Sequence, residues 1–157
     1  MQEGQVLDLY WEPECGRYLE AAVRRLQDTF PGLRVELASV RALDGRHYDG
    51  SRFQYDAVEL LEGFPPDRLC LYLVHRDLYH PGYRYLYGAA LPGRAVVSDF
   101  RPDTQEGFLK EVCHELGHAL GLPHCRRDCV MHPSVSEGEL ERKSPLLCRE
   151  CRKKLQK

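Results

Sequence analysis

Three features of the sequence predict an α/β (mixed α+β) fold built on a twisted mixed sheet. The first 40 residues have the pattern strand, helix, strand; residues 68–74 form a nearly continuous apolar run; and apolar residues recur at the helical period after Asp103. The first pattern favours a parallel pair with a crossover helix, and the second a central buried strand. We therefore expect two helices before the sheet is complete, then a helix that carries the candidate site, then a small C-terminal part.

The individual elements follow from local periodicity and turn residues. Strands are predicted where apolar residues alternate or run together, at residues 5–11, 33–40, 68–74, 85–91 and 94–100. Helices are predicted where they recur at the helical period, at residues 14–30 and 52–61. The pair Pro92-Gly93 predicts a hairpin between the last two strands. Loops are predicted at residues 42–50, 75–84 and 134–144, and the basic tail at residues 152–157 is interpreted as a solvated end that can continue as a short helix.

Length and composition favour one soluble domain. We predict a single domain over residues 1–157, with a sheet-and-helix part at 1–121 and a C-terminal part at 122–157. The net charge of −2 gives no reason to expect nucleic acid or a membrane surface as a partner. No apolar run approaches the roughly 20 residues of a membrane span, and residues 1–4 lack the regions of a signal peptide. A cytoplasmic monomer is expected.

Three histidines at fixed spacing form the strongest pattern. Residues 114–124 read H-E-x-x-H-x-x-G-x-x-H. His114 and His118 lie one helical turn apart, on the side opposite the apolar arc. Gly121 lacks a Cβ and can end the helix, so that the chain doubles back and His124 reaches the same point. Three neutral imidazoles can hold zinc and leave a fourth tetrahedral position for water, which is typical of a catalytic site.

Glu115 lies beside this pair of histidines on the same helix. It is placed to take a proton from water and act as a general base. Asp103 and Glu106 fit a capping box that begins the helix. The alternative interpretation, a surface helix with two solvated histidines, is disfavoured by the added glycine and third histidine at fixed spacing.

Four cysteines predict a second metal site. Cys125 and Cys129 precede a loop, and Cys148 and Cys151 follow it, which is typical of a four-thiolate zinc site. A redox-active C-x-x-C pair is the alternative, but that motif belongs at a strand–helix junction of a thioredoxin-like unit. A reducing compartment favours metal over disulfides. Bound zinc would hold residues 125–151 in place, because these residues have few apolar groups.

The remaining cysteines and histidines lack ligand spacing. Cys70 and Cys113 fall in apolar patterns and are predicted to be small core residues, while Cys15 has no evident partner. The other histidines are interpreted as surface or loop residues: His47, His75, His80 and His132. Of these, His132 is the best candidate for a functional role, because it directly follows Met131 near the site.

The combined pattern over residues 114–151 resembles the archaemetzincins, a family of zinc peptidases in the metzincin clan. Met131, two residues after Cys129, matches the methionine of the turn that lies beneath the metal in this clan. The resemblance implies a metzincin-like fold, two zinc ions (one catalytic and one structural), and a peptide or protein substrate hydrolysed by metal-activated water. It also implies that Met131 packs under the catalytic zinc and does not bind it.

Several questions stay open from the sequence. In metzincins a strand forms the upper rim of the cleft and pairs with extended substrate, but either strand of the predicted hairpin could do so here. Endopeptidase and aminopeptidase activity are both compatible with the pattern. A non-catalytic zinc-binding or interaction module on the same scaffold is the alternative function, although the intact Glu115 argues against it. A zinc-finger nucleic-acid binder is disfavoured by the near-neutral charge.

Overall fold

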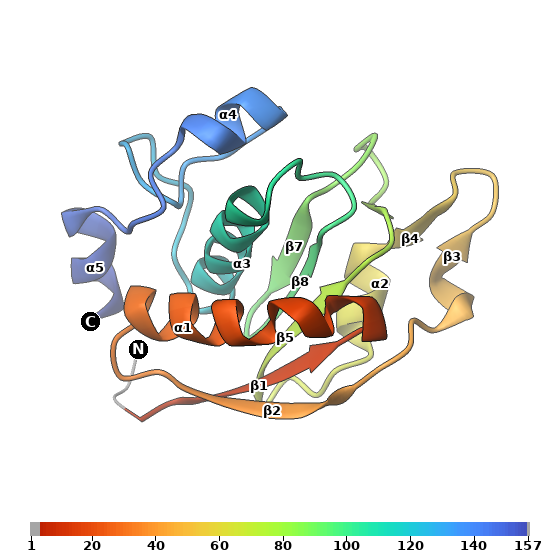
Figure 1. Ribbon diagram of the computed structural model, residues 1–157, viewed down its shortest axis with the longest axis horizontal. Coiled ribbons are helices and arrows are strands. Elements are labelled where there is room, and N and C mark those ends of the chain that lie inside the picture. The colour runs from red at the N-terminus through yellow and green to blue at the C-terminus, as the bar shows by residue number, and fades with distance from the viewer. Residues whose placement is uncertain (1–3, 157) are drawn as a thin grey trace.

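A five-stranded mixed sheet forms the centre of the protein (Figure 1). The computed structural model describes residues 4–156. Residues 1–3, which were searched for a signal peptide, and Lys157, the end of the basic tail, lie outside the described residues. In sheet order the strands are β2 (Arg34–Val40), β1 (Val6–Trp11), β5 (Leu69–Val74), β8 (Arg94–Ser98) and β7 (Gly88–Leu91). Four strands run parallel and β7 runs antiparallel to β8. This confirms the predicted mixed sheet, the crossover pair and the hairpin.

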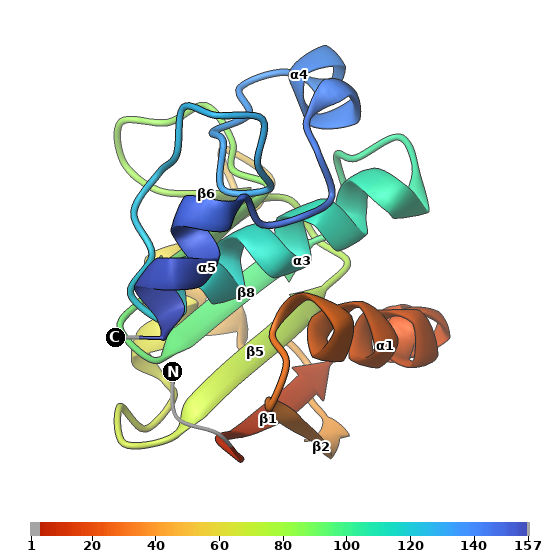
Figure 2. The same ribbon diagram turned by 90° about the vertical axis from the view of Figure 1, so that its left-hand side faces the viewer.

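Helices cover both faces of this sheet (Figure 2). In chain order they are the 3-10 helix η1 (Pro13–Tyr18), α1 (Leu19–Thr29), the 3-10 turn η2 (Gly45–His47), α2 (Ala57–Glu62), α3 (Gln105–Ala119), α4 (Glu137–Arg142) and α5 (Arg149–Leu155). A small second sheet consists of β3 (Tyr48–Asp49), β4 (Gln54–Asp56) and β6 (Leu78–Tyr79). None of the helices in residues 4–156 is long and apolar enough to cross a bilayer.

The central strand β5 shows how the sheet separates two cores. Every residue of β5 is buried. Leu69, Leu71 and Leu73 pack in the cluster that contains α1 and α3, whereas Tyr72 and Val74 pack in the cluster that contains α2. This alternation follows from the two-residue period of a strand. Burying one leucine side chain contributes about 1.5–3 kcal/mol, so this strand anchors both layers.

The C-terminal residues join the first of these cores. Leu147, Cys151 and Leu155 belong to the same hydrophobic cluster as α1 and α3. In Figures 1 and 2 the segment after α3 passes over that helix and ends with α5 beside it. The expected C-terminal part therefore packs on the face of the sheet that α1 and α3 cover.

Two of the predicted element boundaries are wrong for the same reason. Residues 52–61 do not form one helix, because residues 54–56 pair as β4 and the Asp56 side chain accepts hydrogen bonds from the N–H groups of Val58 and Glu59 to start α2. Residues 134–144 contain α4, which begins at the capping hydroxyl of Ser136. A six-residue helix spans less than two turns, so its periodicity is too short to detect. The predicted loops 42–50 and 75–84 also contain β3 and β6.

The predicted capping box of α3 is also wrong. Thr104 is the N-cap residue, and its hydroxyl accepts from the N–H of Gly107 at 3.0 Å. The Glu106 carboxylate pairs with Arg25 of α1 instead of turning back onto its own helix. The Asp103 N–H donates to Glu137 of α4. Asp103 and Glu106 were predicted to bond within the first turn of α3, but each bonds instead to a residue that is distant in the sequence.

Candidate metal centre and active-site cleft

The end of α3 brings its third histidine back toward the helix. Gly121 has φ +101°, a conformation that a residue without Cβ adopts at little cost. The Gly121 N–H donates to the His118 carbonyl and the Leu122 N–H to the Gly117 carbonyl, both at 2.9 Å. These two bonds form a Schellman motif and reverse the chain. The predicted helix end is confirmed in this geometry.

The structure brings His114, His118 and His124 together, and we call them the histidine cluster. The ligand-capable nitrogens lie within 4.8 Å of one another. The Nε2 atoms of His114 and His118 are 3.2 Å apart. Tetrahedral zinc with bonds of about 2.0–2.1 Å separates two ligand nitrogens by roughly 3.3 Å. The spacing of this pair therefore fits zinc.

Backbone carbonyls orient two of the three rings. The Nδ1 atom of His114 lies 2.9 Å from the Val130 carbonyl, and Nδ1 of His118 lies 2.8 Å from the Leu122 carbonyl. A carbonyl only accepts, so each Nδ1 carries the proton and each Nε2 keeps its lone pair. Both lone pairs thus face the point at which His124 arrives.

The surroundings of His114 and His124 also favour the neutral form of these two imidazoles. Burial, followed by the charge of Lys143, lowers the pKa of His114 well below its ordinary value. Burial, followed by the proximity of His118, lowers the pKa of His124. A metal binds the neutral form of imidazole, so these shifts favour ligation.

Glu115 lies against strand β7. Its side chain is buried, and a Cβ added to Gly88 would come within 2.8 Å of Glu115 Cγ and 2.6 Å of the Val96 carbonyl oxygen. Gly88 therefore leaves the space that the carboxylate occupies. Burial and then the neighbouring carboxylate of Glu111 raise the pKa of Glu115 well above its ordinary value, opposed by Lys143.

A buried ion pair behind the histidine cluster is absent from the sequence-based prediction. Lys143 Nζ donates to Glu111 Oε1 at 2.9 Å and to the His132 carbonyl at 3.0 Å, and it lies 3.4 Å from His114 Nδ1. Both charged side chains are almost completely buried. Charged residues are rarely buried without a partner. Glu111 lies three residues before His114, on the histidine side of the helix, and no local pattern indicated that Lys143 would pair with it.

The four predicted cysteines also come together, and we call them the cysteine cluster. The sulfur atoms of Cys125, Cys129, Cys148 and Cys151 lie within 4.8 Å of one another. The pairs Cys125–Cys148 and Cys129–Cys151 are each 3.8 Å apart. A tetrahedral zinc with Zn–S bonds of about 2.3 Å separates its sulfurs by roughly 3.8 Å. All seven cysteines are free thiols, so this arrangement fits a metal and contains no disulfide.

Backbone N–H groups point at one of these sulfurs. The Sγ atom of Cys129 accepts from the N–H of Met131 at 3.4 Å and from the N–H of Cys148 at 3.3 Å. Such bonds stabilise a negatively charged thiolate, which is the form that binds metal. The donor set thus suits a closed thiolate site.

Met131 packs against α3; its expected place beneath a catalytic zinc stays a prediction. It is fully buried, and a Cβ added to Gly117 would lie 2.4 Å from its Sδ atom. The glycine between the first two histidines of the pattern is therefore required by the methionine below it. The sequence-based analysis did not identify this role for Gly117.

A cleft of about 550 Å³ contains the candidate catalytic residues. Its lining includes residues 85–90, which contain the start of β7, and residues 133–135. The histidine cluster and Glu115 line it. Because β7 is the last strand of the sheet, it is the rim strand that the sequence left undetermined between two candidates.

The other histidines and cysteines have ordinary partners. His80 lines the cleft and bonds to Asp56 at 3.2 Å, so it is nearer to the site than expected. His47 pairs with Glu59 and His75 with Asp99, and the His132 ring bonds to the Pro133 carbonyl. Cys70 and Cys113 are buried, which confirms the prediction that they are core residues. Cys15 is buried as well.

Comparison with known proteins identifies the family. The profile described as Peptidase family M54 matches residues 33–157. The chain belongs to this family, the archaemetzincins. Among curated archaemetzincins, that of Archaeoglobus fulgidus is 40% identical over 116 residues, covering 69% of this chain and 72% of the relative. The archaemetzincin of Methanopyrus kandleri is 45% identical over 138 residues, with 78% of each chain covered.

Solved archaemetzincin structures have the same fold. The A. fulgidus protein, determined in complex with malonate, superimposes with a TM-score of 0.89 at 31% identity, covering 96% of this chain and 99% of that one. The M. kandleri protein gives a TM-score of 0.85 at 33% identity, with 97% and 93% covered. Family and fold were both predicted from the sequence, and both are confirmed. Family membership makes this chain a metallopeptidase by descent.

Proposed function

We propose that this archaemetzincin is a zinc-dependent peptidase in which the histidine cluster holds the catalytic zinc and Glu115 is the general base. One observation carries the proposal: the Nε2 atoms of His114 and His118 converge, with their protons on the opposite nitrogens, beside a buried carboxylate in an open cleft. Three histidines leave one tetrahedral position free, as catalytic zinc sites require.

The proposed chemistry divides between the ion and the chain. When bound, zinc lowers the pKa of water toward neutrality, polarises the carbonyl of the scissile bond and stabilises the negative charge that develops there. Glu115 accepts the proton as water adds to the carbonyl carbon, then returns it to the leaving amine. Gly88 lets the carboxylate stay close to the strand that receives substrate.

The substrate would lie along β7 as an added strand. An edge strand has one row of unpaired backbone groups, which an extended peptide can pair with. The cleft runs beside this strand and past the histidine cluster. A peptide bound this way presents its backbone carbonyl to the metal while Glu115 faces the same point.

The cysteine cluster would hold a second, structural zinc. We propose that this ion fixes residues 122–157 onto residues 1–121, so that the chain functions as one domain. The seven free thiols suit a reducing compartment such as the cytoplasm. We expect the protein to act as a monomer without nucleic-acid or membrane partners.

The proposal is tested by counting zinc and measuring hydrolysis on the same preparations. Elemental analysis of metal-replete, dialysed protein should give about two zinc ions per chain. A quenched-fluorescence peptide library should be cleaved by this protein. Glu115→Gln should keep both ions and lose about 10²–10⁴-fold in rate, the usual contribution of a general base.

Glu20→Gln is the matched control, because Glu20 is an exposed carboxylate of α1 that pairs with its neighbour Arg24. Hydrolysis that survives in Glu115→Gln would disprove the general-base assignment. Two bound zinc ions without any hydrolysis across the library would favour the alternative, a zinc-binding module without catalysis. A folded protein that binds no zinc would disprove both sites.

A further inference from the structure

A second cavity, of about 620 Å³, adjoins the active-site cleft and is rich in arginine. Its lining consists of Arg52, Gln54, Asp77, Arg84, Tyr85 and Arg101. Arg84 and Tyr85 line both this cavity and the cleft, so the two are neighbours. We call it the arginine cavity. Neither the proposed catalysis nor the cysteine cluster uses it.

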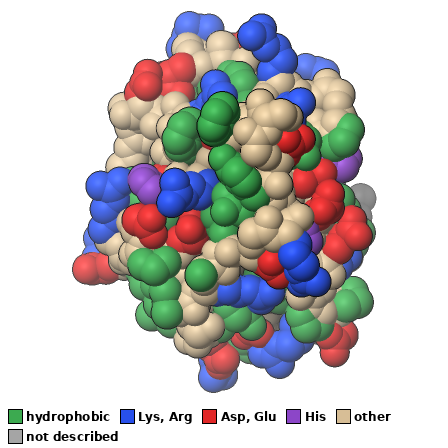
Figure 3. All heavy atoms as spheres, turned by 90° about the vertical axis from the view of Figure 1, so that its right-hand side faces the viewer, with side chains coloured by type: hydrophobic (Ala, Val, Ile, Leu, Met, Phe, Trp, Pro, Cys, Tyr) green, Lys and Arg blue, Asp and Glu red, His purple; other side chains and the backbone are tan. Residues whose placement is uncertain are grey.

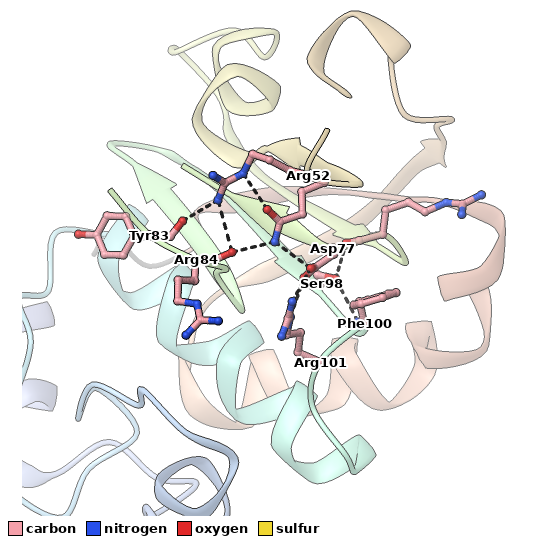
Figure 4. Close-up of polar contacts among 9 residues, drawn as sticks. Arg52, Asp77, Tyr83, Arg84, Ser98, Phe100 and Arg101 are labelled. Carbon is pink, nitrogen blue, oxygen red and sulfur yellow. Dashed lines mark hydrogen bonds and ion pairs between the residues drawn. The ribbon is translucent and has the colours of Figure 1, made fainter. Parts of the chain in front are cut away.

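Two of its arginines are fixed in place (Figure 4). Arg101 binds the buried Asp77 through two bonds of 2.9 and 2.7 Å, and its guanidinium lies 4.0 Å above the ring of Tyr85. Arg52 donates to the Gln54 side chain at 2.9 Å and to the Tyr83 carbonyl at 2.8 Å. Their guanidinium positions are thus set before any ligand arrives.

Arg84 differs because only its backbone is fixed. Its carbonyl accepts from Gln54 Nε2 at 2.9 Å and from Arg52 at 3.4 Å. The side chain is exposed, and within residues 4–156 it makes no hydrogen bond or ion pair. In Figure 4 it points away from Arg52, toward the side of the network on which Arg101 lies. Its donors are therefore available to a ligand in the cavity.

The charge of the lining is positive. Three guanidinium groups face a single carboxylate, that of Asp77, which Arg101 already neutralises. On the side of the molecule where β3 and β4 lie, basic and acidic side chains are otherwise interspersed (Figure 3). Attraction of an anion is hence a property of this cavity and not of the net charge of −2. Guanidinium groups recognise carboxylates particularly well, because their paired donors match the two oxygens.

We propose that the arginine cavity binds a carboxylate of the peptide substrate on the C-terminal side of the scissile bond. This rests on the proposed peptidase function. A peptide that pairs antiparallel with β7 has its C-terminal end nearest the start of that strand, which is where Arg84 lies. Arg84 precedes Gly88, beside Glu115, by four residues, or at most about 13 Å of extended chain. The carboxylate therefore lies within about four residues of the cleaved bond.

The carboxylate can be the C-terminus of a short peptide or an aspartate or glutamate side chain. Peptides cut near an acidic or free C-terminal end are thus the substrate class that we assign.

Matched peptide pairs test this proposal by binding. Fluorescent heptapeptide libraries are made with a free or amidated C-terminus, and with Glu or Gln at one position, and their affinity for zinc-loaded Glu115→Gln protein is measured by anisotropy. The charged member of at least one pair type should bind about tenfold tighter, and its identity shows which source of carboxylate is used. Arg84→Gln should remove most of this preference, and Arg84→Lys should restore part of it.

Arg76→Gln is the control, because Arg76 is an exposed arginine outside the lining of the arginine cavity; it should leave the preference unchanged. Equal affinity within every pair, no binding by any library, or a preference that survives in Arg84→Gln would overturn the proposal. Hydrolysis by the zinc-loaded wild-type protein is measured separately. Cleavage without a carboxylate preference removes this inference alone, whereas a preference without cleavage removes the peptidase function and keeps the binding site.

Discussion

The histidine cluster and the cysteine cluster meet at the consecutive residues His124 and Cys125, yet they differ in how far solvent reaches them. His124 is exposed and His118 is half-buried, so one side of the histidine cluster opens into the cleft. In the cysteine cluster three of the four residues are buried and the fourth is half-buried. Three ligands with an open side suit chemistry, and four enclosed thiolates suit structure. The comparison teaches that access, more than ligand type, separates the two roles.

Metal removal should separate the clusters most strongly. We expect chelation to raise hydrogen exchange most in the two segments that carry the four cysteines, around residues 125–129 and 148–151, while β5 and β8 keep their protection. Hydrogen exchange measured by mass spectrometry before and after chelation checks this. Uniform loss of protection over the whole chain, or no change near the cysteines, would contradict a local structural role.

Removing one ligand from each cluster is the next contrast. Cys151→Ser leaves buried thiolates without a complete metal site and should lower the free energy of unfolding by more than about 4 kcal/mol. His118→Ala should abolish hydrolysis and cost less stability, since that cluster is partly open. Thermal unfolding and peptide cleavage are measured for both variants. Equal effects of the two substitutions on stability would mean that the clusters do not differ as described.

Gly117→Ala should lower the free energy of unfolding by less than the removal of a cysteine ligand. The added Cβ would meet Met131 Sδ at 2.4 Å, so the methionine has to move. Overpacking of this kind costs about 1–3 kcal/mol, and zinc affinity at the histidine cluster should fall with it. Denaturant unfolding and a competitive zinc titration measure the two effects. Gly138→Ala, in the short helix α4, serves as the control, because a Cβ added there would meet the flexible Arg142 side chain and not Met131.

The smallest expected effect is a difference in thiol reactivity immediately after chelation, while the four cysteines still lie together. Burial opposes ionisation of Cys148, but the Cys151 N–H and the neighbouring thiols outweigh it and lower the pKa of Cys148 to about 7. Burial, followed by the neighbouring Cys148, raises the pKa of Cys151. Because the thiolate is the nucleophile, alkylation of Cys148 should increase as the pH rises through 7 and should precede that of Cys151. Peptide mapping after a brief iodoacetamide treatment checks the order, which metal should abolish.

Local chemistry decided what could be predicted from the sequence. Periodicity predicted the sheet, the hairpin and the helix of the histidines, and fixed spacing selected residues that the structure brings together. The ligand roles of those residues and of Glu115 stay predictions. Thr104 as the cap of α3 was missed because the competing partners of Asp103 and Glu106 come from α4 and α1. Long-range pairing of this kind has no local signal.

The same limit explains the missed parts of the site. Gly88 and Gly117 matter through what a Cβ would touch in another segment. Lys143 reaches Glu111 from a region that was predicted to be a surface loop. Arg84 and Arg101 share a cavity only because the chain between them forms the hairpin of β7 and β8. Each of these residues depends on tertiary contacts, which a single sequence does not display.

The adjacency of His124 and Cys125 has a thermodynamic consequence. The Cys125 N–H donates to the Met131 carbonyl, so the segment that positions both residues is closed on itself. When one ion orders this segment, binding of the second ion costs less conformational entropy. The two ions therefore bind cooperatively without touching each other. Reciprocity requires that each ion strengthen the other by the same factor. Zinc titrations should therefore be sigmoidal, and activity should vanish over a narrow range of free zinc.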